Sequence, residues 1–214
     1  MKHFHQGCIV PLALCLAFAA CRSEDESIIP STPTDVGRDS TLVGFYLLNE
    51  GNMGSNKCTL DWYDAISGVY NKNIFAERNP TLPQELGDVG NDLQRYGSKL
   101  YAVVNCSHFV EVMDLDARHI TQISIPNCRY IAFHEGYAYV TSYAGPVQID
   151  PNARLGYVAK IDTATLKVVD ECTVGYQPDE LAISNGKIYV ANSGGYRFPN
   201  YDRTISVIDL ATFT

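Results

Sequence analysis

Three nine-residue segments of this chain repeat one another without gaps, and they constrain the fold more than any other feature. The segments are residues 93–101, 131–139 and 181–189. Each is expected to form a short strand, a tight turn that contains glycine, and a second strand entered at tyrosine, which is the pattern of a β-hairpin. The Asn185-Gly186 turn of the third segment is a strong hairpin signal, because both residues tolerate positive φ. The chain is therefore expected to consist of repeated hairpin units.

A second element recurs between these hairpins, namely a strand-like run that ends in aspartate. The aspartates are Asp64, Asp114, Asp162 and Asp209, and successive spacings are 50, 48 and 47 residues. A carboxylate at the start of a turn accepts hydrogen bonds from backbone N–H groups two residues further along. We therefore interpret the four aspartates as turn formers and not as catalytic acids.

Four strands in each unit of roughly 40–50 residues is the pattern of β-propeller blades. The predicted fold class is therefore all-β, a β-propeller of four-stranded blades, with three strands in the first unit, four in each of the next two and three in the last. Because a closed propeller needs whole blades, the pattern predicts a truncated ring of about 3.5 blades out of roughly seven. The innermost strands are expected at 93–96, 131–134 and 181–184, and the second strands at 43–48, 100–104, 138–141 and 188–192.

Residues 1–20 have the features of a signal peptide. Lys2 precedes a short apolar stretch, Ile9 to Ala20, which is too short to span a bilayer as a permanent helix. The sequence Phe18-Ala19-Ala20-Cys21 resembles a bacterial lipobox, in which the cysteine is lipidated and becomes the new N-terminus. An ordinary signal peptide cut near Ala20, with Cys21 incidental, is the alternative.

The segment that follows Cys21 is predicted to be a tether. Its acidic run at 22–26 resembles the export signal of surface lipoproteins in some Gram-negative bacteria, or is a solvated start of a linker. Residues 21–40 contain proline, serine, threonine and glycine without periodicity, which is typical of a flexible linker. The expected organisation is a signal peptide at 1–20, a lipidated cysteine and flexible tether at 21–40, and a partial β-propeller at 41–214.

Charge and cysteine content exclude two kinds of site. With 16 Lys and Arg against 24 Asp and Glu, the net charge of −8 argues against a nucleic-acid partner. Beyond the tether the cysteines are Cys58, Cys106, Cys128 and Cys172, without a CxxC pair or histidines at zinc-site spacing, so no metal site is expected. Cys106 and Cys128 are expected to lie close together, either as a disulfide or as two thiols.

Two short motifs resemble a known family. Tyr139-Val140-Thr141-Ser142 and Tyr189-Val190-Ala191-Asn192 resemble the YVTN repeat, and together with 161–165 and 208–212 they resemble the YVTN/YncE-like propellers, often labelled surface layer proteins. This resemblance covers residues 41–214 and specifies the fold far more strongly than the function.

A narrower resemblance concerns three loop stretches, residues 48–56, 125–130 and 193–197. They are similar to stretches of cell-surface lipoproteins of this family that capture vitamin B12 above a TonB-dependent transporter. Relatives with other ligands would share the same loops.

In a propeller, the loops after the second and fourth strands of each blade emerge on one face. The loops after the second strands are long here, at 49–57, 105–108, 142–156 and 193–203, and long loops on one face of a repeat array usually mark the binding face. Tyrosine and arginine beside amides suit a large, polar, planar ligand, although such residues are also common in long loops generally. The candidate ligand-binding residues are Asn49, Asn52, Asn127, Arg129, Tyr130, Tyr143, Tyr196 and Arg197.

These observations favour an outer-membrane, cell-surface lipoprotein that acts as a non-catalytic capture module for a corrinoid and delivers it to a TonB-dependent transporter. A structural or adhesive propeller that binds a glycan or protein is the alternative, and a propeller enzyme with a quinone-type cofactor is a lesser one. Because the sequence has no Gly-x-Ser-x-Gly, phosphate loop or recognisable carboxylate pair, we expect no enzyme activity, no catalytic residues and no cofactor. Membrane attachment is expected through the lipid anchor alone.

The lipid anchor predicts a specific change in Cys21→Ala. The variant should no longer partition with membranes, because it lacks the thiol that carries the lipid, and protease added to intact cells should cleave the wild-type protein. Fractionation and immunoblotting measure both. A variant that still partitions with membranes contradicts the anchor, and a wild-type protein protected from protease contradicts exposure at the surface.

Overall fold

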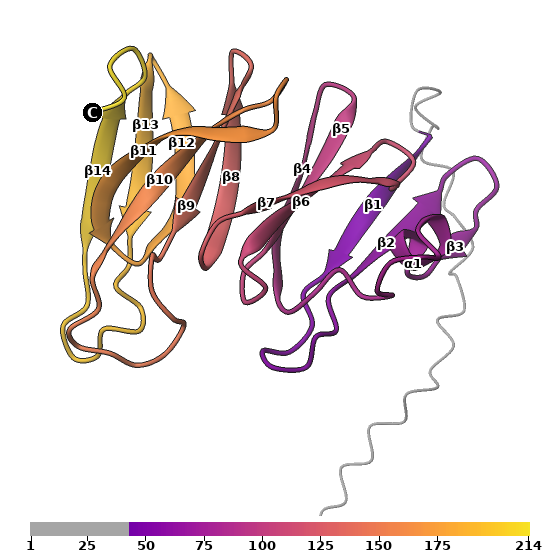
Figure 1. Ribbon diagram of the computed structural model, residues 1–214, viewed down its shortest axis with the longest axis horizontal. Helices are drawn as coiled ribbons and strands as arrows, with labels where there is room; N and C mark the ends of the chain where they lie inside the picture. Colours follow the sequence, from indigo (N-terminus) through magenta and orange to yellow (C-terminus); the bar gives the residue numbers. More distant parts are fainter. Residues whose placement is uncertain (1–42) are drawn as a thin grey trace, which may run out of the picture. The chain divides into compact units, whose positions relative to one another are not determined.

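The computed structural model describes residues 43–214 of the chain, which form four antiparallel sheets (Figure 1). The predicted signal peptide, Cys21 and the tether lie outside the described residues. The first sheet contains β1 (Gly44–Asn49), β2 (Thr59–Asp64) and β3 (Tyr70–Asn71), and helix α1 (Ile74–Arg78) follows it. The second sheet contains β4 (Gly90–Tyr96), β5 (Lys99–Val104), β6 (Phe109–Asp114) and β7 (His119–Ser124). The third contains β8 (Cys128–His134), β9 (Tyr137–Ser142), β10 (Leu155–Asp162) and β11 (Lys167–Tyr176), and the fourth contains β12 (Pro178–Ser184), β13 (Lys187–Asn192) and β14 (Thr204–Asp209).

This arrangement confirms the predicted strand pattern of three, four, four and three. Each sheet is a meander in which strands adjacent in sequence pair with each other, as expected for propeller blades. The sheets follow one another in a row, with the first and the last at opposite ends, so residues 43–214 do not close into a ring (Figure 1). Among the described residues, no helix is both long and apolar enough to cross a membrane.

The recurring aspartates are turn formers, as predicted. In each turn a carboxylate oxygen accepts a hydrogen bond from the backbone N–H two residues on, at 2.8 Å for Asp64 and 2.9 Å for Asp114, Asp162 and Asp209. Bonds from backbone N–H groups of the turn hold the pKa of Asp64 and of Asp162 below its ordinary value. The same local device therefore ends one strand in every sheet, namely β2, β6, β10 and β14.

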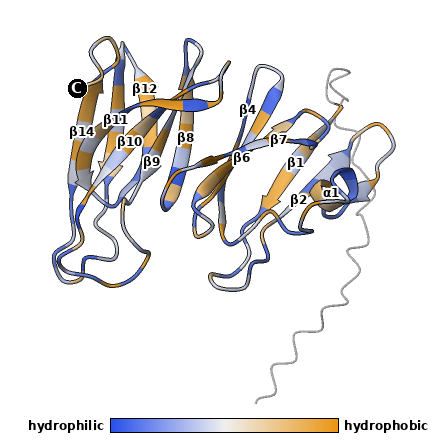
Figure 2. Cartoon of the chain, viewed as in Figure 1, coloured by the Kyte–Doolittle hydropathy of each residue, from blue (hydrophilic) through white to orange (hydrophobic). Residues whose placement is uncertain are grey.

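The core consists of three clusters, each between two consecutive sheets. Strand residues alternate between buried and exposed positions or are buried on both faces in the middle sheets, and the apolar residues lie along the strands (Figure 2). Because both faces of the second and third sheets are covered, β5 and β9 are buried along nearly their whole length. Leu60 and Met113 belong to the cluster of the first and second sheets, Tyr101 and Val140 to that of the second and third, and Val158 and Val190 to that of the third and fourth.

The innermost strands bring the sheets together. Strand β8 contacts both β4 and β12, although these strands are far apart in sequence. The loops that follow β1, β5, β9 and β13 leave one edge of the sheets, whereas the tight hairpins leave the other (Figure 1). We call the first of these edges the loop face, and it is where the starts of β4, β8 and β12 also lie.

Asp61 ties the first sheet together. It is only 6% exposed and accepts hydrogen bonds from the Tyr70 hydroxyl at 2.7 Å, the Asn73 backbone N–H at 2.7 Å and the Asn49 side-chain amide at 2.8 Å. Burial acts to raise the pKa of Asp61, but these three hydrogen bonds outweigh it and hold the pKa below its ordinary value. A carboxyl with a lowered folded-state pKa stabilises the fold above its unfolded-state pKa, and this stabilisation is lost as the pH falls through the lowered value.

Asp61→Ala should therefore destabilise the protein by roughly 1–3 kcal/mol near neutral pH, since three donors lose a charged acceptor. The difference from wild type should begin to shrink as the pH falls below about 4, the ordinary pKa of an aspartate, and should be lost as the pH falls through the lowered pKa of folded Asp61. Denaturant unfolding at several pH values measures both effects. Asp170→Ala, an exposed aspartate of β11 that accepts from the adjacent Glu171 N–H, is the control and should change stability little. A difference for Asp61→Ala that is equally large at neutral and at acidic pH would contradict this account.

Candidate functional site

The three complete inner strands begin with the same irregularity, next to the loop face. Each has a β-bulge within its first four residues, and a bulge leaves residues unpaired and re-aims their side chains. The residue immediately before each strand has the left-handed conformation, with φ of 61° for Val89, 42° for Asn127 and 46° for Gln177. Non-glycine residues with positive φ are uncommon, so their recurrence at equivalent positions marks a repeated structural device.

Arg129 lies in the bulge at the start of β8, and its side chain bridges three sheets. Its Nη1 donates to Asn91 Oδ1 of β4 at 2.8 Å, and its Nε donates to Asp179 Oδ1 of β12 at 3.1 Å. Asn91, Arg129 and Asp179 occupy equivalent positions two residues before the repeated nine-residue segments. The side chains of Arg129 and Asp179 are only 19% and 27% exposed, so their ion pair is largely shielded from water.

Tyrosines surround the Arg129 guanidinium. Its central carbon lies 5.0 Å from the ring centroid of Tyr143 and 5.8 Å from that of Tyr130, within the range of cation–π attraction. The Tyr143 hydroxyl donates to Asp179 Oδ1 at 2.8 Å, and the ring of Tyr196 contacts Tyr143 edge-on at a centroid distance of 6.3 Å. Burial raises the pKa of Tyr143, so this tyrosine is a neutral hydrogen-bond donor at physiological pH.

Side chains of the neighbouring strands hold the bulge of β8 in place by accepting hydrogen bonds from its backbone. Thr141 of β9 accepts from the Tyr130 backbone N–H at 3.1 Å and donates to the Asp179 carbonyl at 2.8 Å. Asp92 of β4 accepts from the Ile131 backbone N–H at 3.1 Å. Burial raises the pKa of Asp92, whereas the bonds that it accepts act in the opposite direction. Donors freed by the bulge therefore find partners on neighbouring strands.

Two hollows open beside these residues. One, of about 390 Å³, lies between the first sheet and β8 and is lined by Leu48, Glu50, Asn91, Asp92 and Tyr130 among others. The other, of about 270 Å³, is lined by Tyr143, Asn152, Arg154 and Gln177 among others. Both hollows are rich in groups that can form hydrogen bonds.

The predicted ligand-binding residues divide into two groups. Arg129, Tyr130, Tyr143 and Tyr196 lie together, and Gln177 Oε1 positions the last of them by accepting from its backbone N–H at 2.6 Å. The other four, Asn49, Asn52, Asn127 and Arg197, make contacts of their own elsewhere on or below the loop face. Ligand binding by all eight residues stays a prediction.

Asn49 and Asn52 lie at the end of the first sheet. The Asn49 amide donates to Thr59 and Asp61 on the neighbouring strand, and Asn192 makes the equivalent contacts to Thr204 and Ser206 in the fourth sheet. Asn49 thus connects two strands of its own sheet, as Asn192 does in the fourth sheet. Asn52 is exposed, and its backbone N–H donates to Ser55 Oγ.

Asn127 and Arg197 are also engaged within the protein. Asn127 is buried, its backbone N–H donates to His108 Nδ1 at 3.2 Å, and its side-chain amide donates to the Gly145 carbonyl. The Arg197 guanidinium stacks on the Tyr176 ring, with its central carbon 3.5 Å from the centroid. Both residues order loops that surround the tyrosines.

Cys106 and Cys128 are free thiols, so the disulfide left open by the sequence is not formed. The buried Cys128 thiol lies near the carbonyl oxygens of Val104 and Phe109, whereas the Cys106 thiol donates to Asn105 Oδ1 at 3.3 Å. Burial raises the pKa of Cys128 to about 12, which keeps it a neutral thiol.

Within residues 43–214, no group of three or more His, Cys, Asp or Glu side chains is placed to hold a metal ion.

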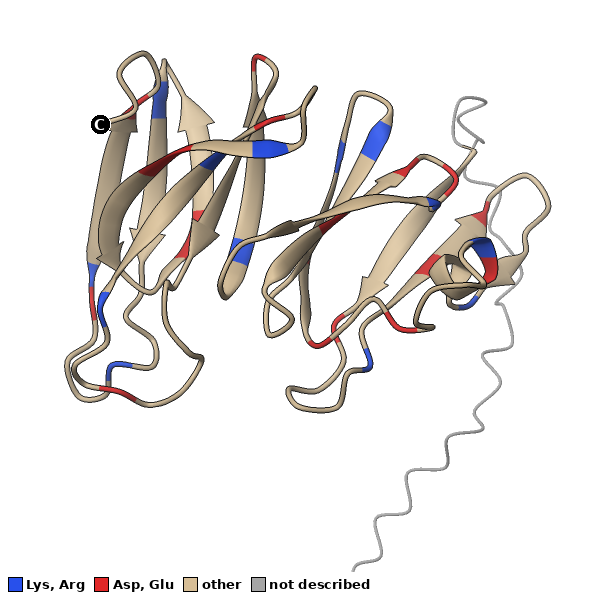
Figure 3. Cartoon of the chain, in the orientation of Figure 1, with Lys and Arg blue, Asp and Glu red and all other residues tan. Residues whose placement is uncertain are grey.

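The residues that complete the cluster around Arg129 were not predicted from the sequence. Asn91, Asp92 and Asp179 do not belong to the nine-residue segments, yet extending that alignment two residues upstream places Asn91 and Asp179 at the position of Arg129. Basic and acidic residues are interspersed across the sheets, so the sign of the charge does not single out this position (Figure 3).

Similarity to solved structures is found at the level of the fold. The chain is similar to hydrazine synthase of Kuenenia stuttgartiensis, with a TM-score of 0.55 and 18% sequence identity over 72% of this chain and 40% of that chain. It is similar to the dihydro-heme d1 dehydrogenase NirN in complex with DHE, with a TM-score of 0.52 and 11% identity over 79% of this chain and 34% of that chain. The computationally designed protein Ika8 is similar with a TM-score of 0.50 and 11% identity, over 79% of this chain and 44% of that chain. No protein-family model and no curated protein matches the sequence.

These findings define the chain as a β-propeller protein. It spans less than half the length of each of the three structures. The prediction that the chain is not an enzyme is contradicted, because two structures that share its fold are named as a synthase and a dehydrogenase. The absence of familiar catalytic motifs does not exclude an activity, because one fold hosts many functions. At 18% and 11% identity, the similarities concern the fold and assign no reaction to this chain.

Proposed function

We propose that the loop face around Arg129 captures a large polar ligand of the corrinoid class and presents it to a TonB-dependent outer-membrane transporter. The observation that carries this proposal is the cluster of Arg129, Tyr130, Tyr143 and Tyr196 beside two polar hollows. Aromatic faces supply contact area at a small cost in conformational entropy, and neighbouring amides and carboxylates supply directional hydrogen bonds.

The chemistry of a corrinoid suits this surface. A corrin ring is broad and carries amide side chains around its edge, which donate and accept hydrogen bonds. Asn91 and Asp92 line one hollow, and Asn152 and Gln177 line the other, so complementary polar groups lie on both sides of Tyr130 and Tyr143. Because Arg129 and Asp179 fix the inner strands relative to each other, the surface is ordered before a ligand arrives, which lowers the entropic cost of binding.

The sequence resemblance supports the same ligand. The three stretches similar to vitamin B12-capturing lipoproteins, residues 48–56, 125–130 and 193–197, contribute Leu48 and Tyr130 to one hollow and Tyr196 to the tyrosine cluster. The proposal includes membership of the YVTN/YncE-like propellers. It also includes attachment to the outer face of the outer membrane through lipid on Cys21.

Calorimetry with cyanocobalamin and with cobinamide tests the ligand class. The full chain should bind at least one of them with a dissociation constant in the micromolar range or below. Binding should weaken by about tenfold or more in the triple variant Tyr130→Ala, Tyr196→Ala, Arg197→Ala, because two aromatic contacts and one cation are removed. Tyr189→Ala, which removes an exposed tyrosine from β13, is the matched control and should bind as the wild type does.

Two results would contradict the proposal. Absence of a heat change at roughly 30 µM protein excludes a corrinoid ligand and leaves a glycan or protein partner as the better account. A triple variant that binds with unchanged affinity excludes the loop face as the site.

A further inference from the structure

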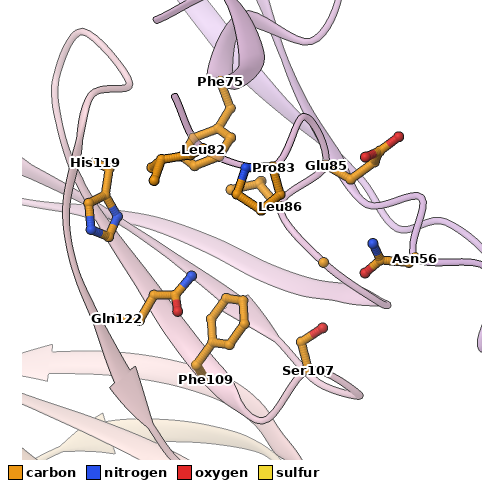
Figure 4. A pocket seen from close by; sticks show the side chains of 11 residues that line it. Asn56, Phe75, Leu82, Pro83, Glu85, Leu86, Ser107, Phe109, His119 and Gln122 are labelled. Atoms are coloured by element: carbon orange, nitrogen blue, oxygen red, sulfur yellow. The ribbon is translucent and has the colours of Figure 1, made fainter. Parts of the chain in front are cut away.

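A separate pocket of about 430 Å³ lies beneath the segment that connects α1 to β4 (Figure 4). One wall is apolar and contains Phe75 from α1, Leu82 and Leu86 from this segment, and Phe109 from β6. His119 and Gln122 of β7 form a polar end. The pocket shares no lining residue with the two hollows of the loop face. Its volume falls in the range that accommodates a small organic molecule.

A buried carboxylate lies behind the polar end. Glu111 of β6 is 0% exposed, and its Oε1 lies 2.5 Å from His119 Nδ1. Its Oε2 accepts from Gln122 Nε2 at 2.9 Å. Burial raises the pKa of Glu111, and the hydrogen bonds from His119 and Gln122 oppose that rise. Both oxygens of the carboxylate are thus engaged by the two side chains that face the pocket.

This arrangement determines what the pocket offers to a ligand. When the neutral His119 ring donates its Nδ1–H to Glu111, the other ring nitrogen, Nε2, carries a lone pair. With its amide nitrogen directed to Glu111, Gln122 retains a carbonyl oxygen as an acceptor. The backbone N–H of His119 donates to the buried Asn79 Oδ1 at 2.8 Å, which fixes the backbone that carries the ring. In this tautomer the polar end is an ordered set of acceptors, with the Glu111 carboxyl group behind it.

The opposite side of the pocket is also acidic. Figure 4 shows Glu85 across the pocket from His119. Glu85 pairs with Lys57 at 3.3 Å, but the Lys57 side chain is 68% exposed, and an exposed ion pair of this kind is weak. Two carboxylates and two neutral acceptors therefore flank an apolar wall that contains the rings of Phe75 and Phe109.

We propose that this pocket binds an organic amine, namely a protonated amine on an apolar body the size of one aromatic ring. The ammonium group donates to His119 Nε2 and Gln122 Oε1, and its charge is balanced by Glu111 behind these two side chains. The ring of the ligand packs on Leu82, Leu86 and Phe109. An ammonium near an aromatic face also gains cation–π attraction.

Titration of the full chain with 2-phenylethylamine tests this site, with 3-phenylpropionate as an anionic probe of similar shape. Calorimetry should detect the amine, and 3-phenylpropionate should bind at least tenfold more weakly, since the pocket repels its carboxylate. In the wild-type protein, the ¹⁵N resonance of His119 Nε2 should shift on addition of the amine. This measurement requires no substitution and so does not depend on the folding of a variant.

Glu111→Gln keeps the shape of the side chain and removes its charge. It should weaken binding of 2-phenylethylamine by about tenfold, whereas Glu135→Gln, at an exposed glutamate of the β8–β9 turn, should leave binding unchanged. The proposal is overturned by any of three results: 2-phenylethylamine fails to bind, 3-phenylpropionate binds as tightly as the amine, or the His119 Nε2 resonance does not move when the amine binds. A folded Glu111→Gln variant with unchanged affinity also overturns it.

Discussion

The guanidinium of Arg129 connects the sheets of the propeller where their innermost strands begin. It donates to Asn91 on one neighbouring sheet and to Asp179 on the other, in a position largely shielded from water. An arginine suits this task because its planar fork offers donors in several fixed directions while it keeps its charge. The tyrosines that define the loop face depend on it directly, since Tyr143 shares the Asp179 oxygen and packs on the guanidinium.

The regularly paired strands and the bulges of the inner strands contribute differently to the structure. The regular strands bury apolar residues between consecutive sheets, and this packing makes the sheets a rigid support. The bulges at the starts of the inner strands interrupt the pairing and direct polar side chains sideways toward neighbouring sheets. The second sheet adds a different polar element, in which the buried Glu111 orders His119 and Gln122 at the edge of a separate pocket.

The features that could be predicted from the sequence are those formed by residues close together in the chain. The nine-residue repeat and the recurring aspartates determine the strands, their pairing and the loop face, because hairpins and aspartate turns form from residues adjacent in sequence. The partners of Arg129 could not be predicted in this way, since Asn91 and Asp179 are 38 and 50 residues away and meet it only when the sheets pack. Asn49 and His119 find their partners, Asp61 and Glu111, on the neighbouring strand of their own sheet, so these contacts depend on the side-chain geometry of a strand pair and not on packing between sheets.

A double-mutant cycle tests most directly whether Arg129 couples the sheets. The free energies of unfolding of wild type, Arg129→Leu, Asp179→Leu and the double variant would be measured by denaturant titration, with Arg95→Leu, at an exposed arginine of the same repeat, as a control. Each single change at the pair should destabilise the fold, and the double variant should lose less than the sum, with a coupling of about 1–3 kcal/mol. Effects of Arg129→Leu and Asp179→Leu that add to within about 0.5 kcal/mol would show that the sheets are held without this ion pair and would contradict the account.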